Sequence, residues 1–125
     1  MPSEKNKYWL PHAIYFQALY AVRDYDRLCG EYHDILYSSA PSADGQPRST
    51  KIGHPTEQKA ERLAEVAEKL DAIDRALDKL PEEYRVPVFN NVRYQRPYPY
   101  TAGVSTWSRW RRRFLFYVAK YLHLW

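Results

Sequence analysis

The sequence predicts an all-α protein in which an N-terminal helical hairpin precedes a C-terminal helical unit. Three patterns indicate this class. Apolar residues recur at three- and four-residue steps over residues 11 to 38, a heptad stripe runs over residues 63 to 80, and residues 105 to 122 separate aromatic from basic side chains at helical spacing. The 125 residues fit one compact domain, or two very small ones that share a core.

The N-terminal helical region covers residues 1–38, and one long helix or two kinked helices fill residues 11 to 38. Pro11 suits the first turn of a helix. Residues 23 to 26 and Gly30 are poor helix formers, so the helix can break at either place. The predicted apolar face consists of Ile14, Ala18, Val22, Tyr25, Cys29, Tyr32 and Leu36.

Residues 39–55 are predicted to form a flexible linker, because three prolines and two glycines stand among residues that offer almost nothing to bury. The third region, residues 56–125, begins with the most regular helix of the chain. Thr56 is its expected N-cap, Glu57 lies in its first turn, and the helical pattern continues to Leu80.

The apolar residues of this helix follow the alternating three- and four-residue spacing of an a/d heptad stripe. Such a stripe packs against another helix. We expect that helix to come from residues 11 to 38 of the same chain, which favours a monomer; a homodimer seam is the alternative. The stripe consists of Leu63, Val66, Leu70, Ile73, Leu77 and Leu80.

The Pro-Glu-Glu sequence after Leu80 predicts a third helix over about residues 82 to 94, with acid at the positive end of its dipole. Pro87 either bends this helix or delays its start. Residues 96 to 103 interrupt regular structure, and Ser105 is the expected N-cap of a last helix that continues to about residue 122. The inner side of the third helix is expected to carry Val86, Phe89 and Val92 or Arg93.

The last helix is predicted to have an apolar and a basic face. Arg111 falls near the apolar arc, where it is expected to extend to the edge or to pair with an acid of the heptad helix. The apolar arc holds Trp107, Trp110, Phe114, Leu115, Tyr117, Val118, Tyr121 and Leu122. The opposite arc holds Arg109, Arg112, Arg113 and Lys120.

Charge is distributed unevenly along the chain. Residues 1 to 80 carry eleven Lys and Arg against thirteen Asp and Glu, a net charge of −2. Residues 81 to 125 carry eight basic residues against two acidic ones, a net charge of +6. A basic C-terminal third behind an acidic body indicates a polyanion as the partner of that third.

The last helix fits a recognition helix for double-stranded DNA, because Arg can fork onto guanine O6 and N7 as well as onto phosphate. Its first turn is the part that meets base edges in a helix-turn-helix. A membrane-surface amphipathic helix and a merely solvated basic face are the alternatives. The expected DNA-binding residues are Thr106, Ser108, Arg109, Arg112, Arg113 and Lys120.

Several classes of protein are not expected. A single cysteine, Cys29, cannot form an intramolecular disulfide or a zinc thiolate cluster. The four histidines have no metal-ligand spacing, and no P-loop, GxSxG or HExxH motif occurs, so we expect no enzyme, catalytic residue, metal site, cofactor or small-molecule substrate. No apolar stretch approaches the roughly 20 residues of a membrane span. The first seven residues are too polar for a secretory signal, which favours a cytoplasmic protein without a membrane partner.

Five segments carry a resemblance to known families. The segment from Ala76 to Val86, a leucine-proline step followed by acid, resembles the opening of sigma-factor region 4. The tail from Ser105 to Leu122 resembles the RinA-type phage transcriptional activators in its Ser-Thr-aromatic start, its basic run and its Val-Ala-Lys-x-Leu ending. Three shorter segments are also similar to the RinA-type family: Arg23-Asp-Tyr-Asp-Arg-Leu, Asp34-Ile-Leu and Pro55-Thr56-Glu57. The likeness covers about residues 20 to 123.

The resemblance implies a sequence-specific, prophage-encoded activator of late, packaging-module transcription that binds double-stranded DNA through the last helix. RNA polymerase is then a second partner, contacted through the acidic N-terminal part. Where region 4 has a scaffold helix and a turn, residues 96 to 104 have room for one helical turn at most. The helix-turn-helix is therefore degenerate, with residues 82 to 94 as its supporting helix, or the tail has become a packing element without DNA contact. The alternative function is a non-catalytic phage structural or adaptor protein with a basic tail that binds nucleic acid or protein.

Overall fold

The computed structural model describes residues 6–38 and 54–125, and all regular secondary structure in these residues is α-helical. The predicted all-α class is confirmed. The predicted linker lies outside the described residues except for its last two positions, which already belong to a helix. The helices are α1 (His12–Arg23), α2 (Tyr25–Ser38), α3 (His54–Leu77), α4 (Glu82–Tyr94) and α5 (Val104–Tyr121).

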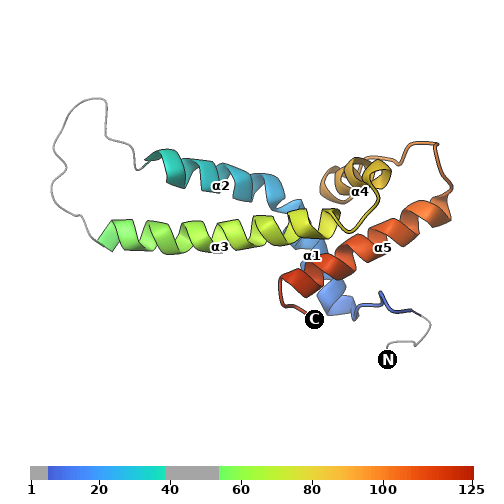
Figure 1. Cartoon of the computed structure of the whole chain (residues 1–125), viewed down its shortest axis with the longest axis horizontal. Helices are drawn as coiled ribbons and strands as arrows, with labels where there is room; N and C mark the ends of the chain where they lie inside the picture. Colours follow the sequence, from blue (N-terminus) through green and yellow to red (C-terminus); the bar gives the residue numbers. More distant parts are fainter. Residues whose placement is uncertain (1–5, 39–53) are drawn as a thin grey trace.

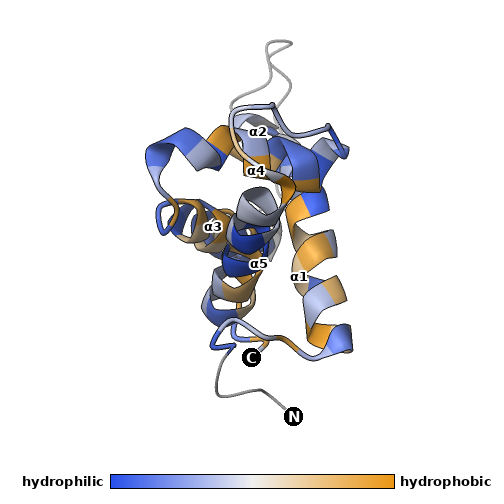
Figure 2. Cartoon of the chain, turned by 90° about the vertical axis from the view of Figure 1, so that its right-hand side faces the viewer, coloured by the Kyte–Doolittle hydropathy of each residue, from blue (hydrophilic) through white to orange (hydrophobic). Residues whose placement is uncertain are grey.

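Helices α2 and α3 lie side by side as a hairpin that projects from a body formed by α1, α4, α5 and the C-terminal part of α3 (Figure 1). Seen from the end of the body, α5 lies between α3 and α1 and below α4 (Figure 2). Three helices therefore pack on α5, which leaves only one side of it for solvent or a partner.

The N-terminal helical region breaks at Asp24, the first of the two predicted places. The Asp24 N–H still donates to the Tyr20 carbonyl at 3.0 Å, and its own carbonyl accepts from the Leu28 N–H at 3.0 Å, so Asp24 closes one helix and opens the next. The buried face of α2 differs from the predicted one. Leu28, which was not expected on that face, is 2% exposed, whereas Leu36, which was expected there, is 43% exposed. Gly30 lies inside α2 without a break.

The helix that carries the heptad stripe packs within the chain against α2, as predicted, and also against α5, which was not predicted. Val66, Ile73 and Leu80 are fully buried, and the alternate members of the stripe are half-buried. An ion pair joins the hairpin where Arg62 Nη2 donates to Glu31 Oε1 at 2.8 Å, and this hydrogen bonding holds the pKa of Glu31 below its usual value. The N-cap prediction is wrong, because α3 begins at His54 and Thr56 lies within its first turn.

Helix α4 has the predicted bounds, and Pro87 lies inside it. Val88 and Val92, four residues apart, face the core and are fully buried. Val86 was expected on the inner side, but it is 64% exposed, because it stands two residues and hence about 200° around the helix from Val88.

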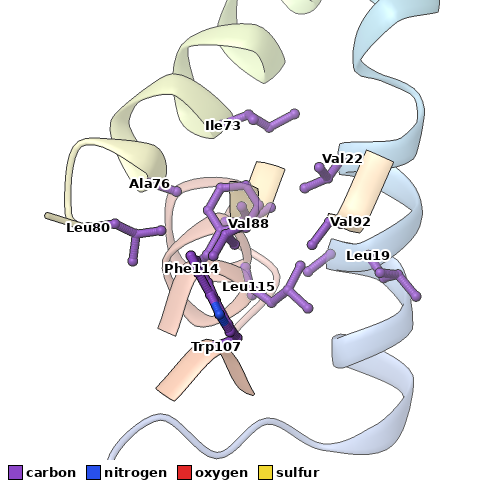
Figure 3. Packing of buried hydrophobic residues seen from close by; sticks show 13 residues of the cluster. Leu19, Val22, Ile73, Ala76, Leu80, Val88, Val92, Trp107, Phe114 and Leu115 are labelled. Carbon is purple, nitrogen blue, oxygen red and sulfur yellow. The ribbon is translucent and has the colours of Figure 1, made fainter. Parts of the chain in front are cut away.

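The core gathers around α5 (Figure 3). Trp107 and Phe114 are its largest fully buried side chains, and both come from α5. Each fully buried large apolar side chain contributes about 1.5–3 kcal/mol relative to an exposed one. α1 supplies Leu19 and Val22, α3 supplies Ile73 and Ala76, the turn after α3 supplies Leu80, and α4 supplies Val88 and Val92.

Candidate nucleic-acid interface

Helix α5 begins two residues before the start that an N-cap at Ser105 predicts. Gly103 precedes it in an extended conformation, and the Gly103 carbonyl accepts hydrogen bonds from the N–H groups of Thr106 at 3.1 Å and Trp107 at 3.2 Å. Ser105 therefore lies in the first turn and is not the N-cap. The first turn holds no acidic residue, so nothing there neutralises the positive end of the helix dipole.

Charge on α5 is of one sign. The helix contains no Asp or Glu but five basic residues, Arg109, Arg111, Arg112, Arg113 and Lys120. The ion pairs within residues 6–38 and 54–125 lie on α2, α3 and α4 or at the turn between α1 and α2, and none includes these five. The positive charge of α5 is therefore not compensated by any carboxylate in the described part of the chain.

Three of the residues predicted to bind DNA lie exposed on one face in the first half of this helix, and we call them the α5 strip: Ser108, Arg109 and Arg112. Thr106, also predicted to bind DNA, is half-buried at the edge of the strip. Lys120 is exposed but follows Arg112 by eight residues, about 12 Å along the helix axis. The structure thus brings three of the six predicted residues together in the first half of α5.

Arg113 does not share the strip with them. Its guanidinium lies 4.6 Å from the ring centroid of Tyr8 and 4.9 Å from that of Trp110, the geometry of cation–π contacts. Its Nε is buried without a hydrogen-bond partner among the described residues. Arg113 therefore belongs to the packing between α5 and the N-terminal segment, in contrast to its prediction as a solvent-facing residue.

Arg111 was expected to reach the edge of the apolar arc or to pair with an acid of the heptad helix. It instead hydrogen-bonds two neutral groups from other elements. Its Nε donates to Asn91 Oδ1 of α4 at 3.1 Å, and its Nη1 donates to the hydroxyl of Tyr15 on α1. Arg111 therefore links α1, α4 and α5 through neutral partners, and no carboxylate of the described residues pairs with its charge.

The N-terminal segment, residues 6 to 11, crosses α5, a contact that sequence analysis missed. The ring of Tyr8 packs edge-on against Phe116, with centroids 5.3 Å apart. Phe116 occupies the face between Arg112 and Lys120, so Tyr8 covers that face and shortens the strip. The aromatic pair Tyr8 and Trp9 was visible in the sequence, but nothing there related it to a helix about a hundred residues away.

The connection between α4 and α5 is well fixed. Asn91 Nδ2 donates to the Arg96 carbonyl at 2.8 Å, and the ring of Tyr98 stacks on Trp107 with centroids 5.1 Å apart and an interplanar angle of 4°. Burial in this stack raises the pKa of Tyr98. The connection runs from Gln95 to Gly103, well beyond the three- to four-residue turn of a helix-turn-helix.

Comparison with protein-family models, curated proteins and solved structures finds no match for the chain. Among residues 6–38 and 54–125, no helix combines the length and the apolar character that a membrane span requires. The same residues hold no group of three or more His, Cys, Asp or Glu side chains arranged to bind a metal ion.

Proposed function

We propose that this chain binds double-stranded DNA in a sequence-specific manner through the α5 strip and activates transcription. The observation that supports the proposal most directly is the charge of α5. Five basic residues stand on one helix without an acidic neighbour on it, and Arg109 and Arg112 are exposed and unpaired within the described residues. When such arginines bind phosphate, no ion pair within the protein has to be broken first. Their free positive charge therefore favours a polyanion as the partner.

In this proposal the two arginines have different roles. Arg109 lies nearer the start of α5, the end of a recognition helix that reaches base edges, and is assigned to a base contact. Arg112, one turn further on, is assigned to a phosphate. Helix α4 supports α5 through Phe89, whose ring centroid lies 6.2 Å from that of Phe114, and takes the place of the supporting helix in a helix-turn-helix.

The remaining parts of the proposal rest on the sequence. The similarity of residues 105 to 122 to RinA-type activators supports late, packaging or structural genes of a phage or prophage as the target. RNA polymerase is the proposed second partner. The acidic α2–α3 hairpin is the proposed surface for it, and its free end, formed by the C-terminal part of α2 and the N-terminal part of α3, projects away from α5 (Figure 1).

A second candidate function is a structural or adaptor protein of a phage particle that holds nucleic acid without sequence preference. One observation favours it. Tyr8 covers the middle of the α5 face, and the strip that remains offers three side chains, fewer than most recognition helices use for base contacts and phosphate contacts together.

Selection from a pool of random duplexes, with the full-length protein immobilised, separates the two functions. A DNA-binding activator enriches one motif after a few rounds, and R109A removes the enrichment while binding to unselected duplexes persists. The matched control is R75A on α3, an arginine that lies next to Asp71, and it leaves the motif unchanged. Retention of all duplexes without enrichment supports the adaptor, and no retention of any duplex contradicts both.

A further inference from the structure

A cavity of about 390 Å³ lies between the N-terminal segment and α5. Tyr8, Trp9 and Leu10 form one wall, and Ser108, Arg111 and Arg112 of α5 form part of the other. Asn6 and Tyr15 complete the polar part of the lining, and no carboxylate of residues 6–38 and 54–125 contributes to it.

The polar groups of the lining have hydrogen-bond donors to spare. Within the described part of the chain, Arg111 uses two of its five N–H donors, on Asn91 and Tyr15, which leaves three. The Tyr15 hydroxyl accepts the bond from Arg111, so its own hydrogen can be donated elsewhere. Asn6 Oδ1 accepts from the Tyr8 N–H at 3.2 Å, so the amide NH₂ of Asn6 is left to donate. Arg112 and the Ser108 hydroxyl add further donors.

The cavity is held in shape before any ligand arrives. Asn91 and Tyr15 fix the guanidinium of Arg111 from two sides. The N-terminal wall is fixed by Tyr8, which contacts Phe116 and Arg113, and by Trp9, whose ring lies 6.1 Å from that of Trp125. A preformed site loses less entropy on binding than one that must be ordered by its ligand.

We propose that this cavity binds a phosphate ester, with the phosphate against Arg111, Arg112 and Ser108 and the organic part against the aromatic wall of Tyr8 and Trp9. Two guanidinium groups and a hydroxyl match the acceptor oxygens of a phosphate. The phosphate ester is either a free nucleotide-sized molecule or a backbone phosphate of DNA. The second source rests on the proposed function, because Ser108 and Arg112 also belong to the α5 strip; the first does not.

Calorimetric titration of the full-length protein with adenosine monophosphate and with inorganic phosphate tests the first source. We expect saturable one-to-one binding of adenosine monophosphate, weakened about tenfold or more in R112Q, because a charge-assisted hydrogen bond is lost. The matched control is R96Q, an exposed arginine in the connection between α4 and α5 that does not line the cavity, and it leaves the affinity unchanged. Inorganic phosphate binds more weakly because it cannot contact the aromatic wall.

Fluorescence anisotropy with a random-sequence duplex tests whether the cavity binds a backbone phosphate of DNA. The experiment compares two serine variants of α5. S108A removes a donor from the cavity, whereas S105A removes an exposed hydroxyl from the same helix outside it. Several-fold weaker duplex binding by S108A and not by S105A assigns the cavity to a DNA phosphate.

The outcomes separate this inference from the proposed function. Binding of adenosine monophosphate that R112Q weakens, without any binding of DNA, supports the cavity and contradicts the proposed function. Binding of DNA that S108A and S105A affect equally, without binding of adenosine monophosphate, overturns the phosphate-ester cavity and leaves the proposed function standing.

Discussion

The side-chain amide of Asn91 holds Arg111 on one side and the backbone of Arg96 on the other. Its Oδ1 accepts from Arg111 Nε at 3.1 Å, and its Nδ2 donates to the Arg96 carbonyl at 2.8 Å. One residue of α4 thus fixes both a charged side chain of α5 and the start of the connection between the two helices. The position of the α5 strip depends on this link, because Arg111 is the neighbour of Arg112.

N91A is expected to lower the free energy of unfolding by about 1–3 kcal/mol, since two hydrogen-bonding groups lose their partner. Urea denaturation followed by circular dichroism measures the loss. N91D is the matched control: it keeps the acceptor for Arg111 and loses only the donor to Arg96, so it should fall between N91A and the wild type. Equal stability of N91A and the wild type would show that the link is dispensable.

The left-handed conformation of Gln95 is a second feature of this connection. Gln95 ends α4 with a φ of 59°, a region that glycine adopts without a steric penalty. Q95G should therefore raise the free energy of unfolding by up to about 1 kcal/mol. Q58G, at an exposed position inside α3, is the control and should destabilise by a similar amount. A destabilised Q95G would mean that the Gln95 side chain contributes more than its backbone costs.

The heptad stripe provides a test of the intramolecular packing. Ile73 is fully buried and Leu70 half-buried between α3 and its neighbours in the same chain. L70E/I73E places two charges in that seam at a cost of several kcal/mol, so the double variant should unfold. E68Q, on the exposed side of α3, should leave the fold intact. A double variant that stays helical and changes only from dimer to monomer by light scattering would contradict the packing.

Asp74 is expected to give the stability of the protein a particular pH dependence. Desolvation of the carboxylate raises its pKa, the hydrogen bond from the Tyr25 hydroxyl at 2.9 Å opposes the rise, and the charges of Asp71 and Asp78 add to it. A carboxyl group with a raised pKa binds its proton more tightly in the folded state than in the unfolded state. Its contribution therefore falls as the pH rises through the interval between the unfolded pKa, about 3.9, and the folded one.

The melting temperatures of D74N and the wild type, compared over a pH series, measure this contribution. The asparagine keeps an acceptor for Tyr25 and has no charge, so the variant should gain stability relative to the wild type as the pH rises above about 4. Hydrogen bonds from Arg27 and Arg62 lower the pKa values of Asp24 and Glu31, so the stabilisation from these two carboxylates increases as the pH rises. This contribution is the same in D74N and in the wild type and cancels in the difference between their melting temperatures. A difference that shrinks with rising pH would contradict the assignment.

Local patterns in the sequence predicted the helices well and their contacts less well. Periodicity and helix-start signals located the helical regions, with one or two helices left open over residues 11 to 38, and the helical wheel placed Trp107 and Phe114 on the buried side of the last helix. Ser105 and Thr56 were wrong as N-caps because each helix begins two or three residues earlier than a cap at these positions implies, which places both residues inside the first turn. Val86 was wrong because apolar character alone does not tell which face of a short helix is buried.

In the candidate site, too, the sequence predicted which residues lie on the helix face but not the contacts between elements. A helical wheel separated Arg109 and Arg112 from the aromatic arc, and both are exposed. The cation–π contacts of Arg113 could not be foreseen, because Tyr8 reaches it from a segment more than a hundred residues away. The partners of Arg111 are a hydroxyl and an amide, which no charge pattern indicates.

The central claim, that the α5 strip binds DNA phosphates, is tested most directly by the salt dependence of duplex binding. The logarithm of the association constant of the wild type, plotted against the logarithm of the salt concentration, should give a steep negative slope. R112A should flatten this slope by about one unit, because each lost phosphate contact releases about one counterion fewer. R113A, whose guanidinium lies between Tyr8 and Trp110, should flatten it less, and R75A should not change it. A wild-type slope near zero, or an R112A slope equal to that of the wild type, would contradict the claim.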